Sequence, residues 1–481
     1  MSVGRNAVKY KIHKRGNADI PAGMEDGGKM KDMTQGAPAK LILGFAAPML
    51  AGSLFQQVYN VADTMIVGRY LGEEALAGVG STGTLTAFLL ALVMGLCNGA
   101  GLIVAQCFGC KDTGKMKKTV VSLIWVAGGM TAVISLLGIV ASRFFLTLLG
   151  VPENVIGYSA EYLHILYSFV CGSVAYNGAA AILRSTGDSR TPLAALAASS
   201  LLNVGLDLFL ITVCGLGVAG AAYATVLSQL LSAVICIVYL VKKRRLLGLS
   251  GMGVKPDRHF VLLIMKTGFP AAFQSCMISL GGMSVQRLVN SYGASVMAAY
   301  VAANRIDSMA IQIIVSIGTA LSVFTGQNMG QDNFGRIHEG LKKTLGMMLT
   351  ASSMVAVLVF TFRRELMGIF LDPSESAQAV GIGAVYLSVI GVAYLIAGVM
   401  QSYQNVIRGA GDVNTCMVAG LTELAGRIVF AYLLSSVIGV TGIWIATPLS
   451  WGCGCVIPVV RYYGGKWKTK KLIEGGMQPA G

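Results

Sequence analysis

The chain has 481 residues, of which 12% are charged and 54% are hydrophobic. A soluble domain has about 25% charged residues, so this chain has too few charges to cover a water-facing surface. The mean hydropathy is +0.68, and the apolar residues form many long blocks. These features indicate a polytopic α-helical membrane protein and exclude disordered, fibrous, disulfide-rich secreted and nucleic-acid-binding proteins.

Apolar runs of roughly 20 residues are long enough to cross a bilayer as helices. The sequence predicts an all-α fold with twelve transmembrane helices, six in each half. The expected spans lie near residues 41–67, 75–106, 119–142, 155–183, 191–213, 218–241, 260–289, 295–328, 344–362, 376–407, 413–436 and 440–460. The predicted domains are a polar basic tail (1–40), a six-helix bundle (41–241), a basic linker (242–258), a second six-helix bundle (259–462) and a second tail (463–481).

The functional meaning of the net charge of +15 depends on where the 37 Lys and Arg residues lie in the chain. The tails and the loops after even-numbered helices hold 29 of them, the loops after odd-numbered helices hold 5, and 3 lie inside spans. Basic loops remain in the cytoplasm, so both termini are expected there, in a multi-pass protein of the plasma (inner) membrane. The first tail lacks the apolar segment of a signal peptide and is expected to be a solvated or lipid-facing arm.

The ten cysteines lie in or at the ends of apolar spans, where a thiol behaves as a small hydrophobic group, and we expect no disulfides. Cys107-Phe-Gly-Cys110 has the spacing of half a zinc site, but no second pair and no nearby His completes it. The short loops contain no nucleophile with an oriented base. The sequence therefore favours a protein that is not an enzyme and has no metal or cofactor.

Four short motifs recur at offsets of 221 to 224 residues, which indicates an internal duplication. The pairs are Gln106-Cys-Phe-Gly109 with Gln327-Asn-Met-Gly330, Arg184-Ser-Thr-Gly-Asp188 with Arg408-Gly-Ala-Gly-Asp412, Gly217-Val-Ala-Gly220 with Gly439-Val-Thr-Gly442, and Pro48 with Pro270. Six helices per repeat give both halves the same orientation in the membrane. Such pseudo-symmetric bundles suit a transporter, although a channel or a membrane enzyme could also be duplicated.

Ionisable residues inside spans are costly and therefore functional candidates. Asp63 lies in the first predicted helix, and Asn203 and Asp207 lie four residues apart on one face of the fifth. The equivalent positions of the second half are Val285, Arg427 and Ala431. Two carboxylates in a low-dielectric cavity repel each other and are poorly hydrated, so such a pair can exchange a proton or, with Asn203, ligate a small hard cation. The alternative is that each aspartate only bonds a neighbouring helix.

The second half contains other charged residues within its spans. They are Arg305 and Asp307 in the eighth helix and Glu423 and Arg427 in the eleventh. Opposite charges on one bundle most often neutralise each other, so we expect internal ion pairs here and consider contact with substrate the minor alternative.

Over residues 40 to 462 the chain resembles the multidrug and toxic compound extrusion (MATE) transporters of the prokaryotic, DinF-like branch. The resemblance rests on Pro48, on the run Gln56-Gln-Val-Tyr59-Asn-Val-Ala-Asp63-Thr, on the repeated Arg-x-x-Gly-Asp motif, and on Asn203 with Asp207. It implies a secondary active efflux antiporter for organic, mostly cationic and amphipathic compounds, driven by H⁺ or Na⁺. Its partners would be small organic substrates and the lipid bilayer, and the protein would be a monomer.

The resemblance also implies roles for individual residues. Asp63, Asn203, Asp207 and Thr225 would form the proton or cation site of the first bundle. Pro48 would let the first helix bend. Polar positions nearby are candidates for the substrate pocket, namely Gln56, Tyr59 and Asn177.

The chain departs from some branches of the family, because its spans near 260–289 and 376–407 contain no Asp or Glu. This difference favours ion coupling through the first bundle. The alternative function is a flippase for lipid-linked oligosaccharides or another lipid precursor, in the same superfamily. We rank it second because the charged residues of the spans include four acids beside Arg305 and Arg427.

Overall fold

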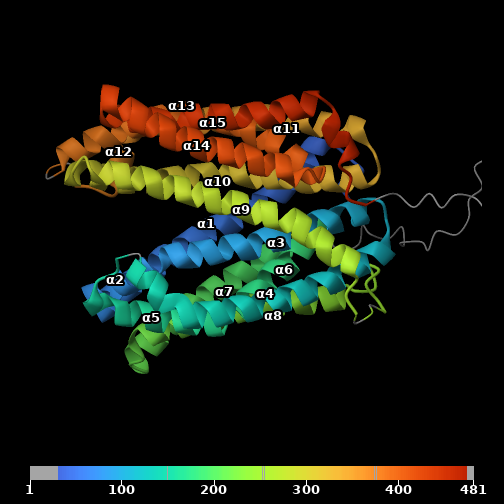
Figure 1. Cartoon of the computed structure of the whole chain (residues 1–481), viewed down its shortest axis with the longest axis horizontal. Helices are drawn as coiled ribbons and strands as arrows, with labels where there is room; N and C mark the ends of the chain where they lie inside the picture. The colour runs from blue at the N-terminus through green and yellow to red at the C-terminus, as the bar shows by residue number, and fades with distance from the viewer. Residues whose placement is uncertain are drawn as a thin grey trace, which may run out of the picture.

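The computed structural model describes residues 31–473 except 149, 252, 254, 373 and 375, and in these residues the regular structure is entirely helical. The helices, in chain order (Figure 1), are α1 (Pro38–Leu71), α2 (Glu73–Ser81), α3 (Gly83–Gly109), α4 (Thr113–Leu148), α5 (Glu153–Ser168), α6 (Cys171–Ser185), α7 (Arg190–Leu208), the π-helix η1 (Phe209–Val213), α8 (Gly217–Lys242), α9 (Arg258–Asn290), α10 (Ala294–Gly330), α11 (Phe334–Thr361), α12 (Arg363–Gly368), α13 (Ala377–Gly409), α14 (Val413–Ile438), α15 (Val440–Tyr463) and the 3₁₀-helix η2 (Lys466–Thr469).

The number of membrane-spanning helices agrees with the prediction. Eleven described helices are long and apolar enough to cross a bilayer, with α2 and α3 running as one span and α7 continuing into η1. The pair α5 and α6, bent by 52°, gives the twelfth. The all-α, twelve-span fold predicted from the apolar runs is therefore confirmed.

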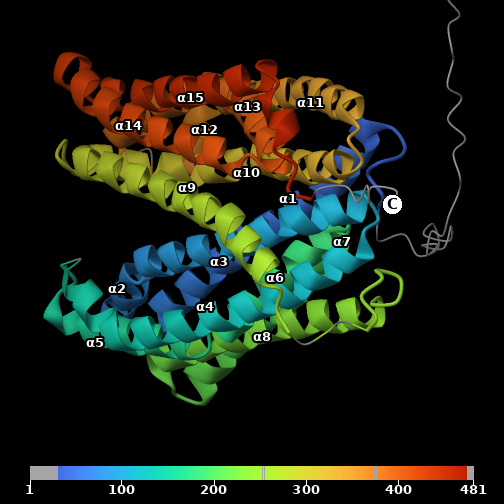
Figure 2. The ribbon, with the colours of Figure 1, turned by 45° about the vertical axis from the view of Figure 1, so that its right-hand side comes forward.

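The two halves form two bundles, α1–α8 and α9–α15 (Figures 1 and 2). The contacts between the bundles are pseudo-symmetric. The first helix of each half packs on the other bundle, α1 against α10 and α9 against α3. Small residues permit the α3–α9 crossing, because a Cβ on Gly95 would lie 2.4 Å from Ala272 and a Cβ on Gly99 would lie 2.5 Å from Gly268. Close approach through small residues is the usual way in which membrane helices associate.

The ends of α3 and α10 make a reciprocal contact that explains the repeated Gln-x-x-Gly motif. A Cβ on Gly109 would lie 1.9 Å from the backbone oxygen of Gln327, and a Cβ on Gly330 would lie 2.2 Å from that of Gln106. The two glutamine side chains then cross to the opposite bundle. Gln106 Nε2 donates to the backbone oxygens of Gly409 and Ala410, both at 3.3 Å, and Gln327 Nε2 donates to that of Ser185 at 2.9 Å.

Two segments outside the spans lie across this junction. We call this side of the molecule the terminal face, because both ends of the described chain, residues 31 and 473, lie there. We call the two segments the N-terminal strap (residues 31–36) and the C-terminal strap (residues 470–473). The amide of Met33 donates to Gln327 Oε1 at 2.8 Å, and the amide of Leu472 donates to Gln106 Oε1 at 2.8 Å. Away from this face, the ribbons of the two bundles draw apart (Figure 2).

Each strap also rests on a glycine of the repeated Arg-x-x-Gly-Asp motif. Gly187 and Gly411 have φ of +86° and +101°, and a Cβ on them would lie 2.1 Å from the backbone oxygen of Lys31 and 2.6 Å from that of Lys470, respectively. Met33 is fully buried. Residues 31–36 are therefore packed between the bundles and are not the solvated or lipid-facing arm that we expected of the tail, whereas residues 1–30 lie outside the described part of the chain.

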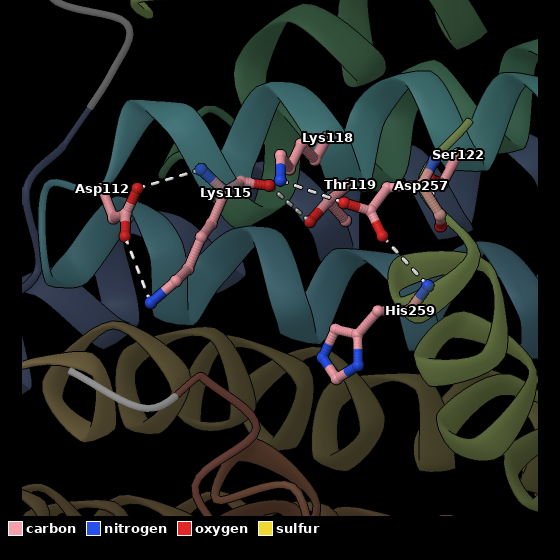
Figure 3. A network of polar contacts seen from close by, with 7 residues as sticks. All are labelled: Asp112, Lys115, Lys118, Thr119, Ser122, Asp257 and His259. Carbon is pink, nitrogen blue, oxygen red and sulfur yellow. Dashed lines mark hydrogen bonds and ion pairs between the residues drawn. The ribbon is translucent and has the colours of Figure 1, made fainter. Parts of the chain in front are cut away.

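The linker between the bundles is fixed to α4 at the start of α9 (Figure 3). Asp257 caps α9 by accepting from the amide of His259 at 3.0 Å, and its carboxylate also meets Lys118 Nζ at 3.0 Å. The hydrogen bond from Lys118 lowers the pKa of the Asp257 carboxyl below its usual value, so the carboxylate remains ionised. Ser122 Oγ bonds the backbone of the same aspartate. This network attaches the first helix of the second half to the first bundle.

The reciprocal contact predicts that Gly109→Ala destabilises the protein. The added methyl group overlaps the Gln327 backbone oxygen, and overpacking of this kind costs about 1–3 kcal/mol. The midpoint of thermal unfolding in detergent should fall. Gly346→Ala in α11, where a Cβ meets nothing within 4 Å, is the matched control and should be neutral or slightly stabilising. Equal midpoints for the two variants would contradict the contact.

Candidate functional site

Polar side chains line the inner faces of three helices of the first bundle at helical spacing. Gln56, Tyr59 and Asp63 follow one face of α1, and Asn203 and Asp207 follow one face of α7. The stripe on α7 begins one turn earlier at Ser199, and α8 contributes a further set. The members on α8 are Thr225, Ser228, Gln229 and Ser232. A stripe of polar groups inside an apolar bundle marks a surface that faces a cavity.

These stripes enclose a cavity of about 250 Å³ in the first bundle. Six of the predicted site residues line it, namely Pro48, Gln56, Tyr59, Asn177, Asn203 and Thr225. Asp63 and Asp207 lie beside this cavity, next to Tyr59, rather than in its lining. The sequence-based set is therefore brought together in one bundle, with the two carboxylates adjoining the space that the others surround.

The carboxyl groups of Asp63 and Asp207 are neighbours where α1 packs on α7. Asp207 is fully buried and Asn203 is 1% exposed, whereas Asp63 is half-buried. Apart from the contact of the two carboxyl groups with each other, no described residue forms a hydrogen bond with either carboxylate oxygen of Asp207 or with Asp63 Oδ1, and the amide group of Asn203 also has no partner. Buried polar atoms normally have partners, so this cluster has an unused capacity to bind a proton or a small cation.

Several residues of the cavity lining or beside the carboxylates were not identified from the sequence. Tyr162, on α5, is 7% exposed and lies beside Asp63, Asp207 and Thr225. Asn98 and Arg184 line the cavity from α3 and α6. Helical spacing of three or four residues from Asn203 or Thr225 could have identified the cavity residues of α7 and α8, such as Ser199 and Ser228. No comparable signal exists for Tyr162, Asn98 and Arg184, because tertiary packing alone places them there.

Pro48 lies inside α1, which runs without interruption from Pro38 to Leu71. Its repeat counterpart Pro270 lies inside α9. Proline removes one helical hydrogen bond and makes a local bend possible. Pro48 lines the cavity one turn from Gly52, so a bend at this position would alter the shape of the cavity.

The charged residues of the second bundle form a separate, largely satisfied set. Glu423 Oε1 accepts from Arg427 at 2.9 Å and from Trp451 Nε1 at 3.1 Å. Asp307 accepts from the hydroxyl of Tyr394 at 2.8 Å and from that of Tyr386 at 3.4 Å.

Of the internal ion pairs expected in this bundle, Glu423 with Arg427 is present, whereas Arg305 and Asp307 form none with described residues. Arg305 is exposed. Two residues apart in an α-helix correspond to a rotation of about 200°, so Arg305 and Asp307 point to nearly opposite faces of α10. At the positions equivalent to Asp63 and Asp207, Val285 and Ala431 are packed in the core. The unpartnered acidic pair therefore has no copy in the second bundle.

The described residues contain no group of three or more His, Cys, Asp or Glu that could hold a metal ion. All ten cysteines are unpaired. Gly215-Leu-Gly217-Val-Ala-Gly220 has the spacing of a dinucleotide fingerprint, but it leads into the membrane helix α8, with Gly217 at φ +58° and Gly220 packed on Leu210. These glycines serve helix packing.

Comparison with known proteins places this arrangement among membrane transporters. The family model described as MatE matches residues 48–209 and 270–433, more than half of the chain. The chain is 30% identical over 446 residues to the "Probable multidrug resistance protein YpnP" of Bacillus subtilis (strain 168), covering 92% of this chain and 99% of that one. It is 28% identical over 440 residues to the "Probable multidrug resistance protein YoeA" of the same organism, with coverages of 89% and 94%.

A solved structure supports the fold. It is described as "Outward-facing conformation of a multidrug resistance MATE family transporter of the MOP superfamily" and aligns with a TM-score of 0.83 at 24% identity. The alignment covers 93% of this chain and 99% of that one. At this identity the likeness establishes the fold and nothing about substrate.

The neighbouring carboxylates predict that Asp207→Asn stabilises the protein at pH 8. The substitution preserves volume and removes repulsion from Asp63, a gain on the order of 1 kcal/mol. Thermal unfolding in detergent measures the effect. Glu153→Gln, which removes an exposed carboxylate at the start of α5, should leave the midpoint nearly unchanged. A lower midpoint for Asp207→Asn would mean that its carboxylate stabilises the fold.

Proposed function

Because the chain belongs to the MatE family of efflux transporters, we propose that it is a secondary active multidrug antiporter. It exports organic compounds, mostly cationic and amphipathic, in exchange for H⁺ or Na⁺. The observation that carries this proposal is the unpartnered acidic pair, Asp63 and Asp207, beside a cavity confined to one of two repeated bundles. The multidrug resistance names of its relatives support the substrate class.

The arrangement of the bundles supports an alternating-access mechanism. The terminal face is closed by the α3–α10 contact and both straps, while the opposite ends of the bundles diverge. The distribution of basic residues supports a cytoplasmic location for the terminal face. In this assignment the bundles are joined at the cytoplasmic end, and their helices diverge toward the outside (Figure 2). Transport then requires the contacts at the terminal face to break as those at the other end form.

Ion coupling acts through the carboxylates of the first bundle. A proton or Na⁺ from outside neutralises the charge of Asp63 and Asp207, with Asn203, Thr225 and Tyr162 as polar neighbours. Neutralisation removes the attraction for a cationic substrate in the adjoining cavity, and Pro48 lets α1 change shape at the same time. Substrate and coupling ion therefore compete for the same negative charge, which is the basis of exchange.

Transport in proteoliposomes tests this mechanism. A fluorescent organic cation is followed under an imposed proton gradient and, separately, a sodium gradient. The wild type should respond to at least one gradient, and Asp63→Asn should reduce gradient-driven transport at least tenfold because the exchangeable charge is gone. Asp372→Asn, in the loop before α13, is the control and should transport normally.

Two outcomes would contradict the antiport mechanism. The first is transport that ignores both gradients, and the second is full activity in Asp63→Asn. Either result would make the lipid-precursor flippase the leading hypothesis. Scrambling of a fluorescent lipid-linked sugar in the same vesicles would then test that function.

A further inference from the structure

A second cavity lies between the bundles, directly inside the terminal face. Its volume is about 120 Å³, and its lining comes from α3 and α6 of the first bundle and from α9, α10 and α13 of the second. Two arginines line it, one from each bundle. They are Arg184 and Arg408, the first residues of the two repeated Arg-x-x-Gly-Asp motifs.

The acidic residues of these motifs do not neutralise the arginines. Asp188 accepts from the amides of Arg190 and Thr191 at 3.0 and 2.9 Å and from the Thr191 hydroxyl at 2.6 Å, so it caps α7. Asp412 pairs with Arg461 at 2.6 Å. No Asp or Glu is among the described residues that line either cavity.

The guanidinium groups retain unused donors. Arg184 forms no hydrogen bond or ion pair with a described residue. Arg408 donates to Gln274 Oε1 at 2.8 Å, but its buried Nε has no partner. Neutral polar side chains complete the lining, including Asn98, Ser322 and Asn405. Two guanidinium groups without a counter-charge in a small, polar cavity are suited to a carboxylate or a phosphate, which the planar fork of arginine binds through paired hydrogen bonds.

A structural role at the helix ends does not account for this arrangement. Both arginines lie in the last turn of a helix, α6 or α13, where a positive charge interacts favourably with the helix dipole. An arginine that pointed into solvent at the terminal face would interact with the helix dipole equally well. Instead both side chains line the space between the bundles, and Arg184 also lines the larger cavity of the first bundle.

We propose that Arg184 and Arg408 form a subsite, shared between the two bundles, for the single carboxylate or phosphate group of an amphipathic substrate. This proposal rests on the proposed efflux function and narrows its substrate class. Because Arg184 joins the two cavities, a molecule with a cationic end near Asp63 and Asp207 places its anionic end between the arginines. Zwitterionic amphiphiles therefore fit the combined space better than simple cations, and the bound anion links the bundles at the closed face.

Equilibrium binding of a matched pair of dyes tests the subsite. One dye is a rhodamine with a free benzoate group, and the other is its methyl ester, which is a simple cation. Fluorescence anisotropy is measured on the full chain in phosphatidylcholine nanodiscs, without any ion gradient. The wild type should bind the acid more tightly than the ester. Arg184→Gln and Arg408→Gln should each raise the Kd of the acid about tenfold or more and leave that of the ester within about twofold.

Matched variants separate this effect from general damage. Arg184→Lys keeps the charge and should recover part of the affinity for the acid. Arg244→Gln, which removes an exposed arginine of the linker, should change neither Kd. Equal losses for acid and ester, or unchanged binding of the acid in both glutamine variants, would overturn the proposal.

A further comparison identifies the source of the anion. Phosphatidylglycerol in the nanodiscs should weaken binding of the acid to the wild type, but not to the glutamine variants, if a lipid phosphate enters the subsite. Unchanged binding assigns the subsite to the substrate's own anionic group. Because no gradient is imposed, failure of ion-coupled transport would leave the binding result intact, and the two proposals fail separately.

Discussion

The contact between the ends of α3 and α10 is the constraint on which the rest of the molecule depends. Only glycine fits at positions 109 and 330, because each lies against a backbone oxygen of the opposite helix. The adjacent Gln106 and Gln327 extend this contact to the far bundle and to both straps. The bundles are therefore joined by these hydrogen bonds together with apolar packing, in which Ile42 and Phe45 of α1 contact the core of the second bundle and Phe260 and Ile264 of α9 contact that of the first.

This closure determines where polar groups remain without partners. In the second bundle, Glu423 bonds Arg427 and Trp451, and Asp307 accepts from two tyrosine hydroxyls. Buried polar atoms without a described partner remain there as well, among them Arg408 Nε. In the first bundle, Asp63, Asn203 and Asp207 have no protein partner for at least one polar atom. Such groups are costly inside a membrane protein. The two halves have thus diverged in their unpartnered groups, which include carboxylates in the first half and arginine Nε atoms in the second.

The sequence predicted those features that depend on local pattern. Apolar length gave the twelve spans, and fixed offsets revealed the duplication. Three of its four motifs lie at close contacts or helix starts, and the fourth, Pro48 with Pro270, lies inside helices. Helical spacing grouped Asn203 with Asp207 on one face of α7. Features that depend on which helices meet were missed or wrong. Arg305 and Asp307 are near in sequence but point apart, Tyr162 reaches the carboxylates only through the packing of α5, and Met33 lies in a polar tail although its side chain is fully buried.

The motif Arg-x-x-Gly-Asp illustrates the same limit. Its repetition is visible in the sequence, and the structure gives each residue a different task. The glycine supports a strap, the aspartate caps a helix in one half and pairs with Arg461 in the other, and the arginine faces the space between the bundles. Equal spacing of a motif in the two halves of one chain shows that its positions are equivalent. Only the contacts of each side chain in the folded protein show what that residue does.

A distance measurement across the terminal face tests most directly whether the glutamine contacts hold it closed. Spin labels are introduced through a non-canonical amino acid at the exposed, pseudo-equivalent positions Gly114 and Gly335. The wild type should give one short distance, and Gln106→Leu with Gln327→Leu should add a longer population. Gln312→Leu, also in α10, should leave the distribution unchanged. A double variant with the wild-type distribution would show that the face is closed by other forces.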